Sequence, residues 1–152
     1  VEETEPTLEG NALLKARAVF LATGLPALAD DTGLEVAALD GEPGVHTARF
    51  AGPEATYDDN VDRLLLDLQG IGDRRARFRT AVALVDGETE MTCDGFVDGR
   101  ITLERQGSGG FGYDPVFAVE GRTFAEMGDE KHEISHRARA LRALAAKLGS
   151  CD

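Results

Sequence analysis

Apolar residues recur at helical spacing near the start of the chain. Residues 7–24 carry them in a pattern that gathers them on one face of a helix, at Leu8, Ala12, Leu13, Ala16, Val19 and Phe20. Thr7 is a suitable N-cap for this helix and Gly24 a suitable terminator. Asn11 and Lys15 are four positions apart, so we expect them side by side on the polar face.

The same pattern predicts two further helices. One covers residues 55–70, with Thr56 near its cap and with Asp58 and Asp59 in its first turn, where acidic side chains interact favourably with the helix dipole. The other runs from about residue 135 to residue 148, and its predicted apolar face consists of Ile134, Ala138, Leu141, Ala145 and Leu148.

Extended segments are predicted between the helices. The apolar run at residues 25–30 predicts a short buried strand, and residues 33–39 predict a second extended piece that ends in the turn DGEPG. Residues 75–85 alternate and are rich in β-forming side chains, and the motifs DGE and DGRI are expected to mark turns in a set of strands over roughly residues 76–104. No internal repeat, linker or low-complexity segment interrupts the chain, which predicts a single α/β domain over residues 1–152 with a mixed sheet.

Composition narrows the functional classes. The chain has 152 residues, 42% of them hydrophobic and 29% charged, which is typical of one globular domain. Its formal charge of −12 argues against binding along a nucleic acid, whereas a divalent cation or a small anion held by local cations fits it. No apolar run approaches the roughly 20 residues of a membrane-spanning helix. Cys93 and Cys151 form no disulfide framework, so we expect a reducing compartment, by default the cytoplasm.

Two adjacent aspartates, Asp30 and Asp31, follow the first predicted strand. Neighbouring side chains on a strand point to opposite faces, so both cannot be ordinary surface residues if the sheet is covered on both sides. A carboxylate at a strand end can reach a cleft, and Mg²⁺ accepts one or two carboxylates while leaving its other positions to water and phosphate oxygens. The pair is therefore a candidate magnesium site. The alternative is an ordinary turn or a helix cap.

The stretch GSGGFGYDP carries glycines in the spacing of a dinucleotide-binding loop. That interpretation requires a helix directly behind the glycines. The pair Asp114-Pro115 argues strongly against it, because the residue before a proline is driven out of the helical region. What remains is a loop that presents Phe111 beside Asp114, an arrangement suited to stacking on a base and hydrogen-bonding its edge. The alternative is that Phe111 is a core residue beneath a hairpin loop.

A third group of polar residues lies in EKHEISHRARAL. His136 and Arg137 fall in the first turn of the last predicted helix, where the helix dipole disfavours cations. A bound anion would reverse that preference, with backbone N–H groups assisting, and Lys131 would add a third cation. A solvated basic turn is the alternative. The sequence has no Cys/His spacing typical of zinc and no G-x-S-x-G serine motif.

Six motifs, taken in order, point to one enzyme family: TLEGNALLKA, PALADDTGLEV, GEPGVHTARFAG, GGFGYDPVF, TFAEM and EISHRARAL. From Val1 to about Leu148 the chain resembles the non-canonical purine nucleoside triphosphate pyrophosphatases, the inosine/xanthosine triphosphate pyrophosphatase family. The resemblance implies an elongated mixed sheet flanked by helices, in two lobes with a nucleotide cleft between them, and a homodimer. It also implies Mg²⁺-dependent hydrolysis of ITP, dITP or XTP to the monophosphate and pyrophosphate, which cleanses the nucleotide pool.

The resemblance assigns roles to individual residues. Glu2 and Asp31 would hold the metal, and Asp31 would also be the catalytic base. Thr32 and Lys15 would lie along the phosphates. The other substrate contacts would come from Phe111, Gly112, Tyr113 and Asp114 around the base, and from Lys131, His136 and Arg137 to the purine and the phosphates.

The chain departs from the family at its front. The family opens with a strand and a Thr/Ser-x-x-Asn-x-x-Lys loop that grips the triphosphate, and the sequence starts after that point, so we expect the domain to lack both. Two alternatives stay open. One is a Maf-like pyrophosphatase acting on pyrimidine or modified nucleotides, and the other is a non-catalytic nucleotide-binding module. Neither a stable nucleic-acid partner nor a membrane partner is expected.

Overall fold

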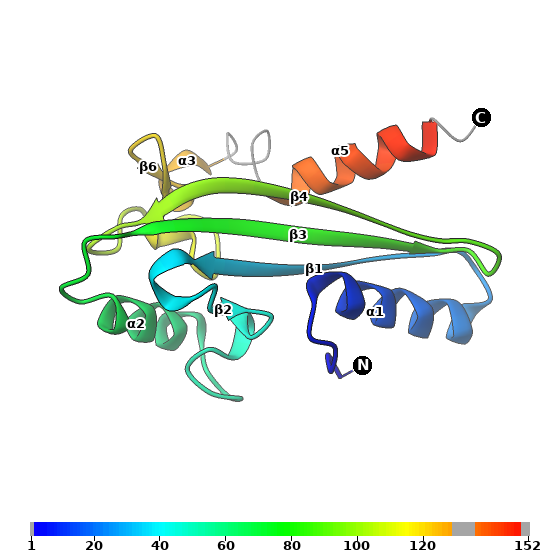
Figure 1. The fold of residues 1–152 in the computed structure, drawn as a ribbon, viewed down its shortest axis with the longest axis horizontal. Helices are drawn as coiled ribbons and strands as arrows, with labels where there is room; N and C mark the ends of the chain where they lie inside the picture. The colour runs from blue at the N-terminus through cyan, green and yellow to red at the C-terminus, as the bar shows by residue number, and fades with distance from the viewer. Residues whose placement is uncertain (1, 129–135, 150–152) are drawn as a thin grey trace. The chain divides into compact units, whose positions relative to one another are not determined.

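The computed structural model describes residues 2–128 and 136–149, and side chains are described for residues 2–128 and 139–146. Six strands form one sheet in the order β2-β1-β3-β4-β5-β6 (Figure 1). The strands are β1 (Ala27–Val36), β2 (Pro43–Gly44), β3 (Arg75–Val85), β4 (Glu90–Ile101), β5 (Phe117–Val119) and β6 (Arg122–Thr123). The helices are α1 (Leu8–Thr23), α2 (Tyr57–Asp67), α3 (Phe124–Met127) and α5 (His136–Gly149), with short 3-10 turns η1 (Ala37–Leu39), η2 (Thr47–Arg49) and η3 (Asp114–Val116). The predicted α/β class is confirmed.

The chain divides into two compact units, and the division falls within β1, β3 and β4. Unit 1 consists of residues 1–32, 79–96 and 135–152, and unit 2 consists of residues 33–78 and 97–134. Three pairings have a defined register, β2 with β1, β4 with β5 and β5 with β6, and all three are antiparallel. The parallel component of the predicted mixed sheet is therefore not found among these pairings.

Helix α1 begins and ends where the sequence predicts. The Thr7 hydroxyl accepts a hydrogen bond from the backbone N–H of Gly10 at 3.0 Å, and Gly24 ends the helix with a φ of 69°. The orientation of the helix differs from the prediction, because Val19 is exposed and Asn11 is buried. The face that carries Asn11 and Lys15 therefore turns partly inward, which brings polar side chains towards the sheet.

Strand β1 is continuous, which corrects the prediction of two separate extended pieces at residues 25–30 and 33–39. It runs from Ala27 to Val36 and includes both aspartates. Because β3 lies beside it in the sheet, strand pairing carries the chain through the glycine without a turn. The reversal comes later, at Asp40 and Gly41, which both have positive φ. Asp30 and Asp31 therefore lie within a strand and not at its end.

Strands β3 and β4 form a hairpin whose turn is closed by Asp86. The Asp86 carboxylate accepts hydrogen bonds from the backbone N–H groups of Glu88 and Thr89, at 3.0 and 2.7 Å, which confirms the predicted DGE turn. The DGRI motif is not a turn, contrary to the prediction, because β4 continues through it to Ile101. Gly99 instead permits close packing: a Cβ there would lie 2.4 Å from the carbonyl oxygen of Ala118.

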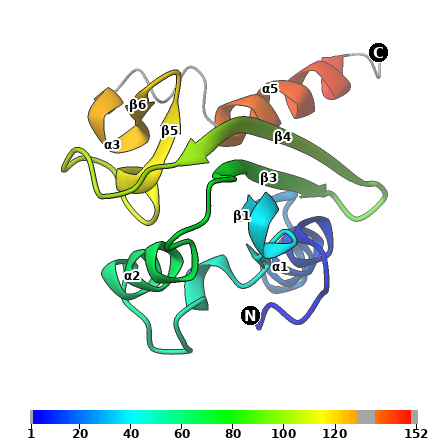
Figure 2. The ribbon, with the colours of Figure 1, turned by 60° about the vertical axis from the view of Figure 1, so that its left-hand side comes forward.

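The core of unit 2 is rich in aromatic rings. Phe117 packs edge-on against Phe78 and Phe124, with ring centroids 4.7 and 5.0 Å apart. These rings come from β3, β5 and α3, and Figure 2 shows α3 beside the hairpin of β5 and β6. Helix α2 of the same unit has the predicted cap, in which Thr56 and Asp59 exchange side-chain and backbone hydrogen bonds. Ile101, Tyr113 and Val116, which flank the glycine-rich loop, belong to the core of this unit.

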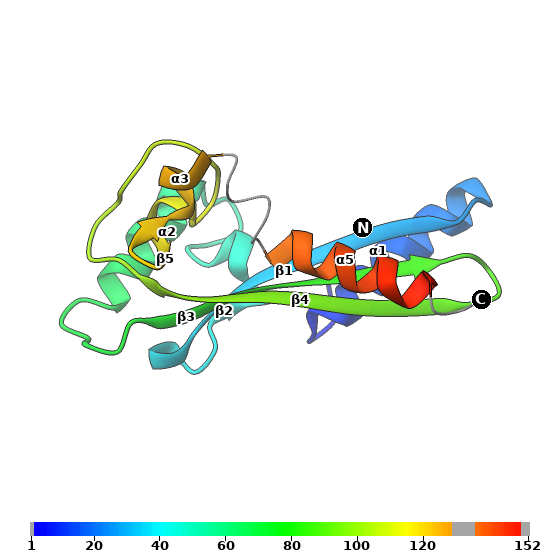
Figure 3. The ribbon, with the colours of Figure 1, turned by 90° about the horizontal axis from the view of Figure 1, so that it is seen from above.

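In unit 1, α1 and α5 lie on opposite sides of the sheet (Figures 1 and 3). Helix α5 buries Ala140 and Leu144 against Val82 of β3, whereas Leu141 and Ala145 are exposed, which corrects the predicted apolar face. Met91 and Cys93 of β4 pack against the same cluster, so the buried stripe of α5 is the one that faces β3 and β4. Ile134 and the side chains of Ala138 and Leu148 lie outside the described residues. Within the part of the chain that the structure describes, no helix combines the length and hydropathy needed to span a membrane.

Candidate active site

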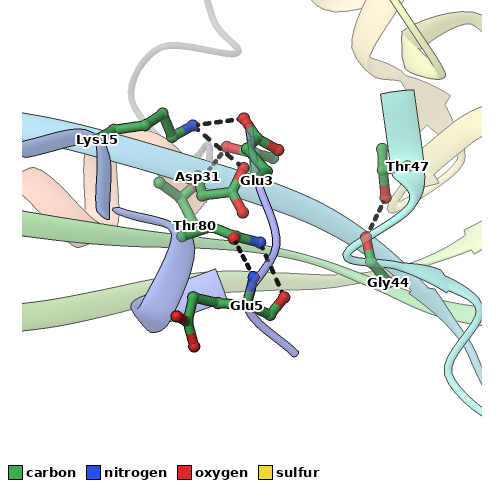
Figure 4. A network of polar contacts seen from close by, with 9 residues as sticks. Glu3, Glu5, Lys15, Asp31, Gly44, Thr47 and Thr80 are labelled. Atoms are coloured by element: carbon green, nitrogen blue, oxygen red, sulfur yellow. Dashed lines mark hydrogen bonds and ion pairs between the residues drawn. The ribbon is translucent and has the colours of Figure 1, made fainter. Parts of the chain in front are cut away.

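Two carboxylates and a lysine meet in unit 1 (Figure 4). The Nζ atom of Lys15, on α1, lies 3.0 Å from Oε1 of Glu3 and 3.4 Å from Oδ1 of Asp31, on β1. The structure thus brings together two of the residues expected to act on the phosphates and the metal. Glu3 joins them, although the sequence analysis selected its neighbour Glu2, which is exposed.

The segment that carries Glu3 is tied to α1 by a buried amide. Asn11 accepts a hydrogen bond from the backbone N–H of Glu5 at 2.9 Å, and its Nδ2 donates to the carbonyl oxygen of Glu5 at 3.3 Å. Since Asn11 is almost fully buried, these two bonds give both the oxygen and the nitrogen of its amide a partner and hold the residues before the helix in place. Asn11 and Lys15 are one helical turn apart, so one face of α1 orients both the backbone and the side chain of this segment.

Asp31 lies in an environment that disfavours its charge. Burial of the side chain raises the pKa of Asp31, the attraction of Lys15 opposes that rise, and the negative charge of Glu3 adds to it. The net direction is upward. A carboxylate with a raised pKa is a stronger base towards water than an ordinary surface aspartate, which suits general-base chemistry near neutral pH.

The donor set of this site fits a hard divalent cation. Oδ2 of Asp31 is buried and has no hydrogen-bond partner among the described residues, and such a group costs about 1–3 kcal/mol or more when it stays unpaired. Glu3 supplies a second carboxylate. The described residues contain no group of three or more His, Cys, Asp or Glu side chains placed to hold a metal ion. Mg²⁺ fits an open pair of this kind, because it retains water and substrate oxygens in its remaining positions.

Thr32 points away from Asp31. Successive side chains of a strand alternate between its faces, and the Thr32 hydroxyl is 2.7 Å from the hydroxyl of Thr80 on β3. Thr80 is fully buried, two positions before Val82, which packs against α5. The Thr32 side chain therefore lies on the α5 side of the sheet, and any contact on the Asp31 side has to come from its backbone.

In unit 2, the glycine-rich loop presents an exposed ring. Phe111 is 53% exposed, which excludes the alternative that it is a core residue. Its backbone N–H donates to Oδ2 of the buried Asp114 at 3.0 Å. Gly110 and Gly112 both have positive φ, and a Cβ on Gly110 would lie 2.1 Å from the Asp114 carboxylate. The glycines and Asp114 therefore determine the conformation of the loop. No long helix follows the loop, as the Asp114-Pro115 pair predicted.

Tyr113 has a different setting from its loop neighbours. Its ring is buried, and its hydroxyl donates to the carbonyl oxygen of Thr47 at 2.8 Å. Burial also raises the pKa of Tyr113, so the hydroxyl stays protonated as a donor. The Tyr113 side chain therefore anchors the loop to η2, and a ligand contact at this position would come from the backbone.

The family can be assigned from comparison with known proteins. The model of the Ham1 family matches residues 1–147. The chain belongs to the Ham1 family. Solved Ham1 structures have the same fold: the Ham1 protein of Staphylococcus aureus has a TM-score of 0.94 at 40% sequence identity, covering 100% of this chain and 81% of that chain. A Ham1 protein from Coxiella burnetii has a TM-score of 0.92 at 42% identity, covering 99% of this chain and 80% of that chain.

Curated relatives of this Ham1 chain carry a functional name. The dITP/XTP pyrophosphatase of Chlorobaculum tepidum is 56% identical over 170 residues, covering 98% of this chain and 75% of the relative. The dITP/XTP pyrophosphatase of Porphyromonas gingivalis is 54% identical over 148 residues, covering 95% of this chain and 76% of the relative. These matches agree with the family resemblance seen in the six sequence motifs.

Three expected site residues of the Ham1 chain cannot be placed. Lys131 lies outside the described residues, and of His136 and Arg137 only the helical backbone is described. Glu3, in contrast, is a contact that the sequence analysis missed. A signal for it existed, since a lysine on a half-buried helix face needs a carboxylate partner, and both Glu2 and Glu3 were available in the preceding segment. Sequence spacing alone does not choose between two adjacent acids.

Proposed function

We propose that this Ham1 chain hydrolyses non-canonical purine nucleoside triphosphates, namely dITP, XTP and ITP, to the monophosphate and pyrophosphate. Relatives more than 50% identical over nearly the whole chain are named dITP/XTP pyrophosphatases. The observation that carries the proposal is the buried carboxylate of Asp31, which has Oδ1 near Lys15 and Oδ2 without a hydrogen-bond partner among the described residues. That arrangement suits a group that binds a cation and accepts a proton.

Asp31 has the central role in the proposed reaction. Its carboxylate accepts the proton of the water that attacks the α-phosphorus, and its raised pKa favours that transfer. Lys15 supplies a cation to the site, and because two of its three N–H donors contact Glu3 and Asp31, the third is available to a phosphate oxygen. Mg²⁺ bound through Asp31 and a glutamate of the segment before α1 would offset the negative charge of the phosphate oxygens. The pair of Lys15 and Glu3 keeps the ammonium group oriented before substrate arrives.

Recognition of the base is assigned to the loop of unit 2. Phe111 offers an exposed ring for stacking, and the positive φ of Gly112 lets the backbone approach a planar ligand closely. Asp114 supports this loop through the Phe111 N–H and is also proposed as an acceptor for the base edge. Lys131, His136 and Arg137 remain predicted contacts to the purine and the phosphates, as the resemblance implies.

The function is tested by measuring pyrophosphate release from ITP, XTP, dITP, ATP and UTP with Mg²⁺. Wild type should release pyrophosphate from the first three in preference to ATP and UTP. Asp31→Asn should lower turnover by about 10²-fold or more, because a positioned general base typically contributes 10²- to 10⁴-fold. Asp30→Asn removes the same charge from the adjacent position and should lose much less.

Three results would contradict this assignment. Asp31→Asn turnover within tenfold of wild type would remove Asp31 from the reaction. A preference for UTP would favour a Maf-like pyrophosphatase, and calorimetric binding of ITP without pyrophosphate release would favour a nucleotide-binding module.

Two wider expectations belong to the same proposal. The family resemblance implies a homodimer, which light scattering of the purified protein tests directly, and a single species of monomer mass would contradict it. The cytoplasm remains the proposed compartment. Within the part of the chain that the structure describes, Cys93 forms no disulfide, and this supports the proposal of a reducing environment.

A further inference from the structure

Two aromatic rings stand side by side on the surface of unit 2. The centroids of Tyr57 and Phe111 are 6.3 Å apart with an interplanar angle of 43°, and the two residues are 61% and 53% exposed. The other aromatic side chains of this unit are buried: Phe50, Phe78, Tyr113, Phe117 and Phe124. Exposing two adjacent rings forgoes the stabilisation that burial would bring. Core packing therefore does not explain the exposed position of these two rings.

Both rings are mounted on ordered backbone. Tyr57 is the first residue of α2, directly after Thr56, whose hydroxyl accepts from the Asp59 N–H at 3.1 Å. Phe111 is held through its backbone N–H by the carboxylate of Asp114, at 3.0 Å. Since neither capping contact involves the Tyr57 side chain, substitution there leaves the start of the helix intact. The two rings thus come from separate, independently anchored segments.

We propose that Tyr57 is a positioning residue for the base of the substrate, acting through Phe111. The inference rests on the proposed function, in which Phe111 stacks on the purine. A phenyl ring at a glycine-rich loop has rotamer freedom that binding must remove, and a neighbouring ring in a tilted contact restricts it beforehand. Tyr57 therefore lowers the entropic cost of ordering the Phe111 side chain. It also enlarges the aromatic surface available to a purine base.

The kinetic test compares five variants on ITP. Tyr57→Ala should raise KM about three- to tenfold with kcat nearly unchanged, the range expected from the loss of one aromatic pair. Tyr57→Phe should restore the wild-type KM, because the ring and not the hydroxyl makes the contact. Phe111→Ala should raise KM further, and adding Tyr57→Ala to it should have little additional effect. Leu66→Ala is the matched control, because Leu66 is an equally exposed apolar residue on α2 at 68%.

Tyrosine fluorescence gives a second readout that does not depend on turnover. The chain has no tryptophan and two tyrosines, and Tyr113 is buried. Inosine monophosphate should therefore change the emission of Tyr57, whereas inorganic pyrophosphate, which has no base, should not. The Tyr57→Phe protein retains only Tyr113 and corrects for light absorbed by the nucleotide.

Failure of the inference differs from failure of the proposed function. A wild-type protein that releases no pyrophosphate from any purine triphosphate would refute the function. An active wild type whose Tyr57→Ala variant keeps the wild-type KM, or whose double variant shows the product of the two single losses, would overturn the role of Tyr57. If Tyr57→Ala altered only the molecular mass measured by light scattering and left KM unchanged, the proposed role would also be overturned. Tyr57 would then belong to a contact between subunits. Thermal melting verifies that each variant is folded, and Tyr57→Leu replaces Tyr57→Ala if the latter is not.

Discussion

At the residue scale, the pKa values of Lys15 and Asp31 both depend on their neighbours in the site. Burial by itself would lower the pKa of Lys15, but the hydrogen bond to Glu3 and the attraction of Asp31 and Glu3 outweigh burial and raise that pKa. Lys15 is therefore charged at neutral pH. The pKa of Asp31 is also raised, because desolvation of its carboxylate outweighs the attraction of Lys15. Because its folded-state pKa lies above the unfolded value, Asp31 favours folding at low pH, and this contribution is lost as pH rises through the folded pKa.

The two neighbours should shift the Asp31 pKa in opposite directions. Lys15→Met removes the charge that lowers it, so the pKa should rise further, whereas Glu3→Gln removes a charge that raises it, so the pKa should fall. Carboxyl ¹³C shifts followed by NMR during a pH titration of the metal-free, nucleotide-free protein measure both. Asp86, held in the β3–β4 turn by backbone hydrogen bonds, is the internal control and should not change. Shifts of the same sign in both variants would mean that the described contacts do not control Asp31.

The Mg²⁺ dependence of activity should distinguish the role of Glu2 from that of Glu3. Glu3 contacts the lysine that Asp31 also contacts, so Glu3→Gln should raise the Mg²⁺ concentration for half-maximal pyrophosphate release by roughly tenfold or more. Glu2→Gln alters the adjacent, exposed carboxylate and is the matched control. The geometry predicts the smaller effect for Glu2, while the family resemblance assigns Glu2 to the metal. A larger effect in Glu2→Gln would return the ligand role to Glu2.

At the scale of elements, strand β4 depends on a glycine in its interior. Gly99 faces the backbone of Ala118 and the ring of Phe117, so the side-chain-free position lets β5 and the aromatic core of unit 2 approach the strand. A glycine in a strand normally weakens it, and close approach of another backbone is one of the recognised reasons for its presence. The DG pair thus has a packing role here and not a turn role.

Gly99→Ala should therefore destabilise the protein. The new Cβ would overlap backbone and ring atoms that have little freedom to move, and overpacking of this kind typically costs about 1–3 kcal/mol. Gly72→Ala is the matched control, because a Cβ there meets no atom within 4 Å and should change stability by about 0.5 kcal/mol or less. Urea unfolding followed by circular dichroism measures both. Equal midpoints for Gly99→Ala and wild type would show that β5 can move away at no cost.

At the scale of the whole molecule, the charge opposes the proposed substrate. The formal charge is −12, from 16 basic and 28 acidic side chains, and a nucleoside triphosphate is itself a polyanion. Long-range attraction therefore cannot drive binding, and the affinity has to come from local cations and a bound metal. The excess of acidic over basic residues also disfavours binding to nucleic acid, because such binding needs a broad surplus of basic residues.

Local features of this protein were determined by the sequence itself. The N-caps of α1 and α2 and the turn at Asp86 join residues no more than three positions apart, so residue type and spacing were sufficient to predict them. The α/β class and the family followed from patterns that span the whole chain. Within the site, the selection of Lys15, Asp31 and Phe111 came from residue chemistry and resemblance. The structure adds that Lys15 lies near Asp31 and that Phe111 is exposed.

Only the tertiary structure decided features whose partners are distant in the chain. Gly99 is needed because Ala118 lies against it, and α5 turns Ala140 towards β3 because Val82 is there. Glu3 was distinguished from Glu2 by the position of Lys15, and Tyr57 was joined to Phe111 by the packing of α2 beside the glycine-rich loop. Periodicity states which side chains share a face of their own element. It contains no information about which other element covers that face, because that depends on contacts between segments far apart in sequence.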